Sequence, residues 1–293
     1  MRVPLVDVSY ELLDSGDQAK LERFGEYVLS RPAPQAIWSR RLPSRLWSEA
    51  DATYTRSPSG GGSWHHRRPL PQSWMLELGG LSLKIKPTDF GHLGVFPEQQ
   101  PHWGWITRMI RESPGPVNVL NLFAYTGGST LAAAAAGASV CHLDSSRGVV
   151  AWARDNAVLS HLVDCPVRWI VDDVTKFVRR EDRRGRRYDA IILDPPSFGR
   201  GPKGEVWKIE RELPVLLRAC RTLLSDRPLF VLLSCHSPGF TPLVLRNLLA
   251  EMMTGTGGRF DAAEMALAES DGERSLPSGS FARWVAGNEV DDE

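Results

Sequence analysis

The sequence predicts an α/β fold: a doubly wound, mostly parallel, seven-stranded sheet of the Rossmann-like type, with a small N-terminal α+β extension. Three observations carry this prediction. Short apolar runs alternate with helical segments from residue 117 onward, which is typical of parallel strands joined by right-handed crossovers. Two runs, within 119–127 and 191–198, stop abruptly at polar turn residues, as buried parallel strands do. Two strand-like segments close the chain and suit an antiparallel hairpin.

The extension is expected to cover residues 1–112, because the sequence before this point lacks a regular alternation of strand-like and helical segments. Residues 1–70 are interpreted as irregular, since they contain many Pro, Ser, Gly and Trp residues. The pattern predicts a short helix at 17–28, a hairpin at 74–86 around Gly79-Gly80, a loop at 90–99 and a helix at 100–112.

The main domain is expected to cover residues 113–293. Its apolar runs predict strands at 117–123, 139–143, 166–171, 188–193 and 228–234. Helices are predicted at 128–136, 146–160, 173–181, 207–224 and 241–254. The closing strands are predicted at 260–267 and 280–286.

Composition limits the classes of function. Lys plus Arg and Asp plus Glu are both 35, so net charge does not indicate attraction of nucleic acid to the whole surface. The arginine-rich run 179–187 is interpreted as a solvated helix end. The four cysteines lack metal-ligand spacing, which predicts reduced thiols and no metal site. No apolar run reaches about 18 residues, and the N-terminus does not resemble a signal peptide. We therefore expect no membrane partner and a cytoplasmic location.

The run from Asn121 to Gly128 joins a strand end, a Gly-Gly turn and an Ala-rich helix. This arrangement brings backbone N–H groups and close-approach glycines against a ligand. Because the run has no GxGxxG, a dinucleotide ligand is disfavoured. The alternative is an ordinary turn between a strand and a helix.

Carboxylates follow the next two predicted strands. Asp144 ends the second strand, where a carboxylate accepts hydrogen bonds from ribose hydroxyls. Asp173 follows the third strand, where a carboxylate accepts from the exocyclic amine of adenine. The alternative for both positions is the N-cap of the following helix.

The fourth predicted strand ends at Asp194-Pro195-Pro196-Ser197-Phe198. The two prolines stiffen the chain and stop both strand and helix. A rigid, carbonyl-rich turn beside a carboxylate suits the amino-bearing edge of a planar base. The alternative is a plain loop.

These four motifs, in this order, resemble the class I S-adenosylmethionine-dependent methyltransferases. The fourth is typical of members that act on amino groups or ring atoms of nucleic-acid bases. The chain resembles most closely the 23S ribosomal RNA large-subunit methyltransferase family of the cytosine-C5 type. The segments that carry the resemblance are residues 94–99, 121–127, 194–199 and 234–237. The resemblance covers about residues 74–240.

The resemblance implies S-adenosyl-L-methionine as the cofactor and RNA, ribosomal or otherwise structured, as the partner; a homodimer is left open. It implies cofactor contacts by Phe96, Gln99, Asn121, Phe123, Ala124, Tyr125, Thr126, Gly127, Asp144, Asp173 and Asp194. Within that set, Phe123 to Gly127 line the methionine part, and Asp194 lies near the sulfonium and the target base. Catalytic roles fall to Asp194, Pro195, Pro196 and Cys235, and Phe198 is expected to stack on the substrate base.

Two departures from the family pattern stand out. Cytosine-C5 members begin with a compact RNA-binding barrel, which the text of residues 1–70 does not obviously supply. The family's Asp-Gln-Arg is here Glu98-Gln99-Gln100.

Two chemistries stay open. Cytosine C5 is a poor nucleophile, so its methylation requires a thiolate that adds to C6, and Cys235 stands where family members carry it. In the alternative, Cys235 is a small side chain buried in the hydrophobic core. The methyl group is then transferred directly to an amino group of a nucleobase or to another planar substrate. Rival functions are a nicotinamide-dependent oxidoreductase and a catalytically silent RNA-binding methyltransferase fold.

Overall fold

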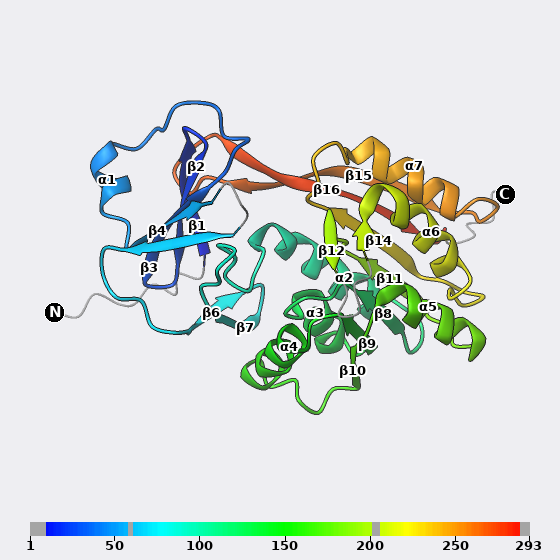
Figure 1. The fold of residues 1–293 in the computed structure, drawn as a ribbon. Coiled ribbons are helices and arrows are strands. Elements are labelled where there is room, and N and C mark those ends of the chain that lie inside the picture. Colours follow the sequence, from blue (N-terminus) through cyan, green and yellow to red (C-terminus); the bar gives the residue numbers. More distant parts are fainter. Residues whose placement is uncertain (1–9, 58–60, 201–205, 288–293) are drawn as a thin grey trace. The chain divides into compact units, whose positions relative to one another are not determined.

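The computed structural model describes residues 10–57, 61–200 and 206–287 of the chain (Figure 1). The chain forms two compact units. The first comprises the residues up to Gln100 together with Ala266–Pro277, and the second comprises Pro101–Met265 and the residues from Ser278 onward. The sequence predicts a boundary after residue 112, whereas the two units divide after Gln100. The reason is that helix α2 (Gln100–Arg111) belongs to the second unit from Pro101 onward.

The sheet of the second unit has seven strands in the order β10-β9-β8-β11-β14-β16-β15, which confirms the predicted fold class. Its strands are β8 (Asn118–Leu122), β9 (Ser139–Asp144), β10 (Val167–Val171), β11 (Ala190–Leu193), β14 (Phe230–Cys235), β15 (Arg259–Ala268) and β16 (Ser275–Val285). β8, β9, β10, β11 and β14 pair in parallel, and β16 runs antiparallel to β14. The chain moves outward from β8 to β10 and then returns to β11 on the other side of β8. This reversal is a topological switch point, where open α/β sheets bind ligands.

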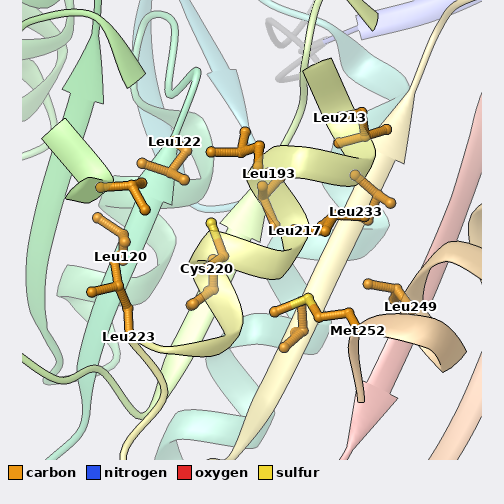
Figure 2. Close-up of a cluster of buried hydrophobic side chains, with 14 of the residues drawn as sticks. Leu120, Leu122, Leu193, Leu213, Leu217, Cys220, Leu223, Leu233, Leu249 and Met252 are labelled. Carbon is orange, nitrogen blue, oxygen red and sulfur yellow. The ribbon is translucent and has the colours of Figure 1, made fainter. Parts of the chain in front are cut away.

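Helices cover both faces of this sheet. The helices of the second unit are α2, α3 (Gly128–Ala135), α4 (Arg147–Leu159), α5 (Val174–Arg183), α6 (Ile209–Arg221) and α7 (Pro242–Met252). Leu120, Leu193 and Leu233 pack against α5, α6 and α7 in one buried cluster, part of which is drawn in Figure 2. Val119 and Ile192 pack with α2 and α3 in a second cluster. Alternate residues of one strand thus enter opposite cores, which explains the continuous apolar runs.

The predicted arginine run lies at the end of α5, where several of its side chains form ion pairs. Arg180 pairs with Asp172, and Arg184 pairs with Glu181 at 3.5 Å. These local pairs agree with a solvated helix end. None of the helices in the described part of the chain has the length and apolar character needed to span a bilayer.

The first unit contains a five-stranded sheet, so the prediction that residues 1–70 are irregular is wrong. Its strands are β1 (Tyr10–Gly16), β2 (Ala19–Phe24), β3 (Tyr27–Pro32), β4 (Ala52–Arg56) and β5 (Gly62–His66), with a short helix α1 (Ser44–Ser48). The predicted helix at 17–28 is also wrong, because β2 and β3 occupy most of it. Asp17 and Gln18 adopt left-handed backbone angles, which make a tight hairpin turn. Pairing of β2 with both neighbours overrides the helix propensity of its Leu, Lys and Glu residues.

The remaining short elements are one predicted hairpin, a 3-10 turn and a strand pair that the sequence did not predict. The hairpin around Gly79-Gly80 is confirmed as β6 (Trp74–Leu78) and β7 (Leu81–Ile85). A 3-10 turn, η1 (Pro97–Gln99), precedes α2. β12 (Phe198–Arg200) and β13 (Val206–Lys208) form an antiparallel pair inside a region that was expected to be a loop followed by helix.

A buried carboxylate organises the first sheet. Glu22 is fully buried and accepts hydrogen bonds from the guanidinium of Arg31 at 2.8 and 2.9 Å, while the Lys20 ammonium lies 3.0 Å away. Burial alone would raise the pKa of Glu22, but the two cations hold it at about 2. Arg31 also donates to the carbonyl of Gly91, so the same pair fastens the 88–98 segment to the sheet.

We expect Glu22→Gln to destabilise the protein by about 3–5 kcal/mol at pH 7, because it leaves the buried Arg31 charge unpaired. The folded-state pKa of Glu22 is depressed, so its stabilisation is full above its ordinary pKa and is lost as the pH falls toward 2. Denaturant titrations between pH 7 and pH 3 should therefore show a shallower loss of stability for the variant than for the wild type. Glu11→Gln removes a half-exposed pair with Arg23 on the same sheet and is the control. Equal effects of the two variants would contradict this account.

Candidate active site at the carboxyl ends of the strands

The sheet register brings the predicted polar residues to one edge. Leu122 is paired with Leu143 and with Leu193, and Asp144 is paired with Val171. The residues that follow these positions therefore leave the sheet at the same level. Phe123, Asp144, Asp173 and Asp194 emerge together around the switch point between β8 and β11.

The loop after β8 has an unusual backbone. Phe123 and Tyr125 have φ angles of 55° and 50°, and Gly127 has 93°. Left-handed angles at bulky residues cost free energy and persist only where neighbouring contacts hold them. The N–H of Ala124 donates to the carbonyl of Leu143 at 3.0 Å, and that of Tyr125 donates to Asp144 Oδ2 at 3.1 Å. The end of β9 thus holds the loop in its strained conformation.

Buried polar side chains support the loop from beneath. Asn121 donates to Thr130 Oγ1 at 2.9 Å, and that hydroxyl contacts His142 Nδ1 at 2.9 Å. Asn156 donates to the carbonyl of Thr126 at 2.9 Å. Burial, and then the charge of Arg154, lower the pKa of His142 to about 3, so this histidine is neutral. The Asn121 side chain donates to the first turn of α3, and its contact with the cofactor stays a prediction.

Two glycines are required by what surrounds them. A Cβ atom on Gly128 would lie 2.4 Å from the indole ring of Trp103. A Cβ on Gly127 would lie 3.2 Å from Ala153, in addition to its unfavourable φ angle. The loop is therefore pressed between α2 and α4.

Asp144 accepts hydrogen bonds from the backbone of Tyr125, Ser145 and Ser146. Its Oδ2 accepts from Tyr125, and its Oδ1 accepts from the N–H of Ser146 at 2.9 Å. Burial raises the pKa of Asp144 despite these backbone hydrogen bonds. A carboxylate has about four acceptor sites, so the three backbone hydrogen bonds leave about one for a ribose hydroxyl. The N-cap of α4 is Ser146 and not Asp144.

Asp173 is the N-cap of α5 and accepts from the N–H of Lys176 at 2.9 Å. Its neighbour Asp172 accepts from the N–H of Asp173 and pairs with Arg180. The cap explanation is therefore correct for Asp173. Adenine binding by a remaining lone pair of Asp173 is compatible with the cap and stays a prediction.

Asp194 lies at the end of β11, and its side chain is 28% exposed. His236 Nδ1 is 3.4 Å from Asp194 Oδ1. Burial alone would raise the pKa of Asp194, but the charge of His236 and hydrogen bonds with His236 and Ser234 hold it below its ordinary value. Asp194 is thus ionised at neutral pH and acts as an acceptor.

The Pro195-Pro196 turn is held by a residue that sequence analysis missed. Trp207, from β13, donates its indole N–H to the carbonyl of Pro196 at 2.7 Å. The same indole packs against Phe123 with ring centroids 5.0 Å apart. Trp207 therefore ties the loop after β8 to the turn after β11. No local signal identified it, because its partners lie far away in sequence.

Phe198 is 50% exposed, and Pro196 is exposed while Pro195 is buried. Ser197 Oγ and Ser237 Oγ are 2.6 Å apart, which links the turn to the residues after β14. An exposed aromatic ring beside a rigid turn is a suitable stacking surface.

Cys235 is the last residue of β14 and is 1% exposed. Its Sγ accepts from the N–H of Ser237 at 3.4 Å. Burial raises the pKa of the Cys235 thiol, so the thiol and not the thiolate predominates at neutral pH. These surroundings are those of a structural cysteine and not of an activated nucleophile.

Phe96 and Gln99 belong to the first unit. Gln99 is buried and donates its N–H to the carbonyl of Phe96 at 3.0 Å, and the Phe96 ring packs edge-on against His92. Their contact with the cofactor stays a prediction.

A model of the S-adenosylmethionine-dependent methyltransferases matches residues 51–231. Among curated proteins, the chain is 28% identical over 239 residues to the ribosomal RNA large subunit methyltransferase K/L of Shewanella frigidimarina, covering 74% of this chain and 33% of that protein. It is 33% identical over 163 residues to the protein of the same name from Marinobacter nauticus, covering 52% of this chain and 21% of that one. The chain thus spans a third or less of these two relatives.

Solved structures give a fuller match. The SAM-dependent methyltransferase from Agrobacterium tumefaciens has a TM-score of 0.91 at 41% identity, covering 95% of this chain and 91% of that one. SMU.776 in complex with SAH has a TM-score of 0.75 at 20% identity, with 95% and 76% covered, which shows a shared fold.

We expect Gly128→Ala to destabilise the protein by about 1–3 kcal/mol, because the added methyl group meets Trp103 and forces the loop or α2 to move. Calorimetric titration should also show weaker binding of S-adenosylmethionine. Gly148→Ala in α4 is the matched control, since nothing lies within 4 Å of its added Cβ. Unchanged stability and affinity in Gly128→Ala would show that the loop is not pressed against Trp103.

Proposed function

This chain belongs to the S-adenosylmethionine-dependent methyltransferase family, and from this premise we propose that it methylates a base of structured RNA, with ribosomal RNA as the leading candidate. The observation that carries the proposal is the ionised Asp194 beside the rigid Pro195-Pro196 turn at the switch point of the sheet. An ionised carboxylate binds a hydrogen-bond donor of the substrate. On a planar base, that donor is the exocyclic amino group.

We propose that S-adenosylmethionine lies across the carboxyl ends of β8, β9 and β10. The loop Phe123–Gly127 would hold its methionine part, Asp144 its ribose and Asp173 its adenine. The fit is supported by the close-packed glycines of the loop and by the remaining acceptor site of Asp144. When bound, the cofactor supplies an electrophilic methyl group on sulfur, and the protein supplies orientation.

The substrate base would stack on Phe198 and Pro196 and donate an amino hydrogen to Asp194. The carbonyl of Pro196 already accepts from Trp207, so the Pro195 carbonyl is the proposed second acceptor for the amine. Methyl transfer requires the acceptor atom to lie about 3–3.5 Å from the methyl carbon. If the base belongs to a helix, it has to be flipped out of the stack to reach this edge.

Of the two chemistries, the surroundings of Cys235 favour direct transfer. A thiolate that adds to cytosine C6 has to be exposed to the base and readily deprotonated. Cys235 is buried within the end of a strand, and its pKa is raised. Asp194 instead is partly exposed, as an acceptor for an exocyclic amine has to be.

The assignment of RNA rests on the printed names of the curated relatives and on the Asp-Pro-Pro turn. Because the chain spans only a third or less of those relatives, their substrate comes to this chain as part of the proposal. The decisive experiment incubates the purified protein with labelled S-adenosylmethionine and fractionated RNA and identifies the product by nucleoside mass analysis. A folded protein that binds the cofactor but labels no RNA would support a catalytically silent fold or another planar substrate.

We expect Asp194→Asn to lower the rate of methyl transfer by roughly 100-fold or more, because the amide presents a donor where the substrate amine needs a charged acceptor. Calorimetry should show cofactor affinity close to that of the wild type. Asp182→Asn, on the exposed side of α5, is the control and should leave the rate unchanged. Full activity of Asp194→Asn would remove the proposed role of this carboxylate.

We expect Cys235→Ser to keep activity within a few-fold of the wild type, because direct transfer forms no bond to the cysteine sulfur. The measurement is the initial rate of methyl transfer to the RNA fraction identified above, with Cys220→Ser as a second buried-cysteine control. A complete loss of activity in the folded Cys235→Ser protein alone would favour the covalent route to cytosine C5.

A further inference from the structure

A small cavity lies at the edge of the seven-stranded sheet opposite to the candidate active site. Asn118 and Ser139 are the first residues of β8 and β9, and both line this cavity together with Pro166, which precedes β10. Its volume is about 160 Å³, below the range of about 300–1,000 Å³ that is usual for pockets of drug-sized ligands. The cavity, called here the amino-end pocket, therefore suits a small chemical group and not a whole nucleotide.

The charged residues that line the amino-end pocket are all cationic. They are Arg168 on β10 and the consecutive residues Arg186 and Arg187, which precede β11. Within the described part of the chain, no Asp or Glu lines this pocket. The hydroxyl of Ser139 and the amide of Asn118 add neutral polar groups to the lining. Guanidinium groups without a competing carboxylate suit an oxyanion, and their planar fork matches the oxygens of a phosphate.

The end of α5 brings two of these arginines to the pocket. Gly185 adopts a left-handed φ of 64°, and its N–H donates to the carbonyl of Asp182 at 2.9 Å. The N–H of Arg186 donates to the carbonyl of Glu181 at 3.0 Å. This pair of hydrogen bonds is the Schellman pattern, which ends a helix and turns the chain. Arg186 and Arg187 therefore leave the helix and lead into the amino end of β11.

A buried carboxylate fixes the third arginine. Glu181 is fully buried and accepts from Arg168 Nη2 at 2.6 Å and from the hydroxyl of Tyr188 at 2.6 Å. Burial alone would raise the pKa of Glu181, but the hydrogen bonds from Tyr188 and Arg168 hold it below its ordinary value. A guanidinium has five N–H donors, so this ion pair leaves other donors of Arg168 for a further acceptor. One guanidinium of the pocket is thus held in place.

The other carboxylates that contact the lining residues also have partners. Asp189 accepts from the backbone N–H of Asn118 at 2.8 Å. Asp182 lies 4.0 Å from Arg187, and both side chains are about half exposed. Arg186 is exposed and makes no ion pair with any residue that the structure describes. The positive charge of Arg186 is therefore available to a ligand.

We propose that the amino-end pocket binds a phosphate group, with Arg168, Arg186 and Arg187 as its donors. The source that we assign is a backbone phosphate of the RNA. The exposed Arg183 and Arg184 precede the pocket residues in the chain and extend the run of positive charge, as a polyanion requires. β8 has five residues, so the pocket lies about 16 Å from the catalytic edge, and the RNA has to extend beyond the methylated nucleotide. The RNA source rests on the proposed function, whereas the phosphate site does not.

The first test titrates the full-length protein with inorganic phosphate at constant ionic strength and follows the arginine Nε–H signals by NMR in mildly acidic buffer. Saturable shifts are expected at Arg168, Arg186 and Arg187, and none at Arg246, an exposed arginine of α7. Arg186→Ala should weaken phosphate binding by about 10-fold, because charge-assisted hydrogen bonds are lost. Arg246→Ala makes the same change outside the pocket and is the control. Absence of saturable shifts at Arg186 and Arg187 would overturn the proposal.

The second test measures binding of a fluorescein-labelled RNA hairpin by anisotropy over a range of salt concentrations. Arg186→Ala should lower the RNA affinity and reduce the slope of log K against log salt by about 0.7–0.9, the effect of one lost phosphate contact. Arg246→Ala should change neither, and Arg187→Ala replaces Arg186→Ala if that variant does not fold. Weakened phosphate binding with unchanged RNA affinity would contradict the RNA source and leave a site for free phosphate. RNA that binds through the pocket but is not methylated would contradict the proposed function alone.

Discussion

The parallel register of β8, β9, β10 and β11 is the constraint on which the candidate site depends. These strands are hydrogen-bonded neighbours whose last residues lie level, so everything that follows them meets at one edge. Both sheet faces are buried under helices, which prevents the strands from slipping without exposing apolar side chains. The strained loop after β8 and the turn after β11 are tolerated because this framework does not move.

Aromatic side chains outside the motifs support the candidate site. Trp103 of helix α2 packs against Gly128 at the start of α3. Trp207 makes a second connection, from Phe123 in the loop to Pro196 in the turn. The proposed cofactor and substrate positions are therefore mechanically linked through aromatic side chains that do not belong to any of the motifs.

Prediction from the sequence succeeded where local pattern and tertiary environment agree. The runs around Leu120 and Ile191 are apolar on both faces, and the strands that they form are buried on both faces. Prediction failed at 17–28, where Leu, Lys and Glu favour a helix but pairing with β1 and β3 makes a strand. Glu22 shows the reason: its burial is stabilised by Lys20 on the same strand and by Arg31 on the neighbouring strand β3, and helix propensity does not include such pairing.

The sequence by itself determined the fold class, the family resemblance and the edge at which Asp144, Asp173 and Asp194 gather, because each depends on short-range pattern and strand order. Only the tertiary structure decided how each side chain is used. It made Ser146 the cap of α4, joined Asn121 to Thr130 by a hydrogen bond, and buried Cys235. It also brought Trp207 of β13 against Phe123 of the loop after β8. Such placements depend on packing between distant segments. The burial and the partners of a side chain, more than its residue type, then determine its pKa and its reactivity.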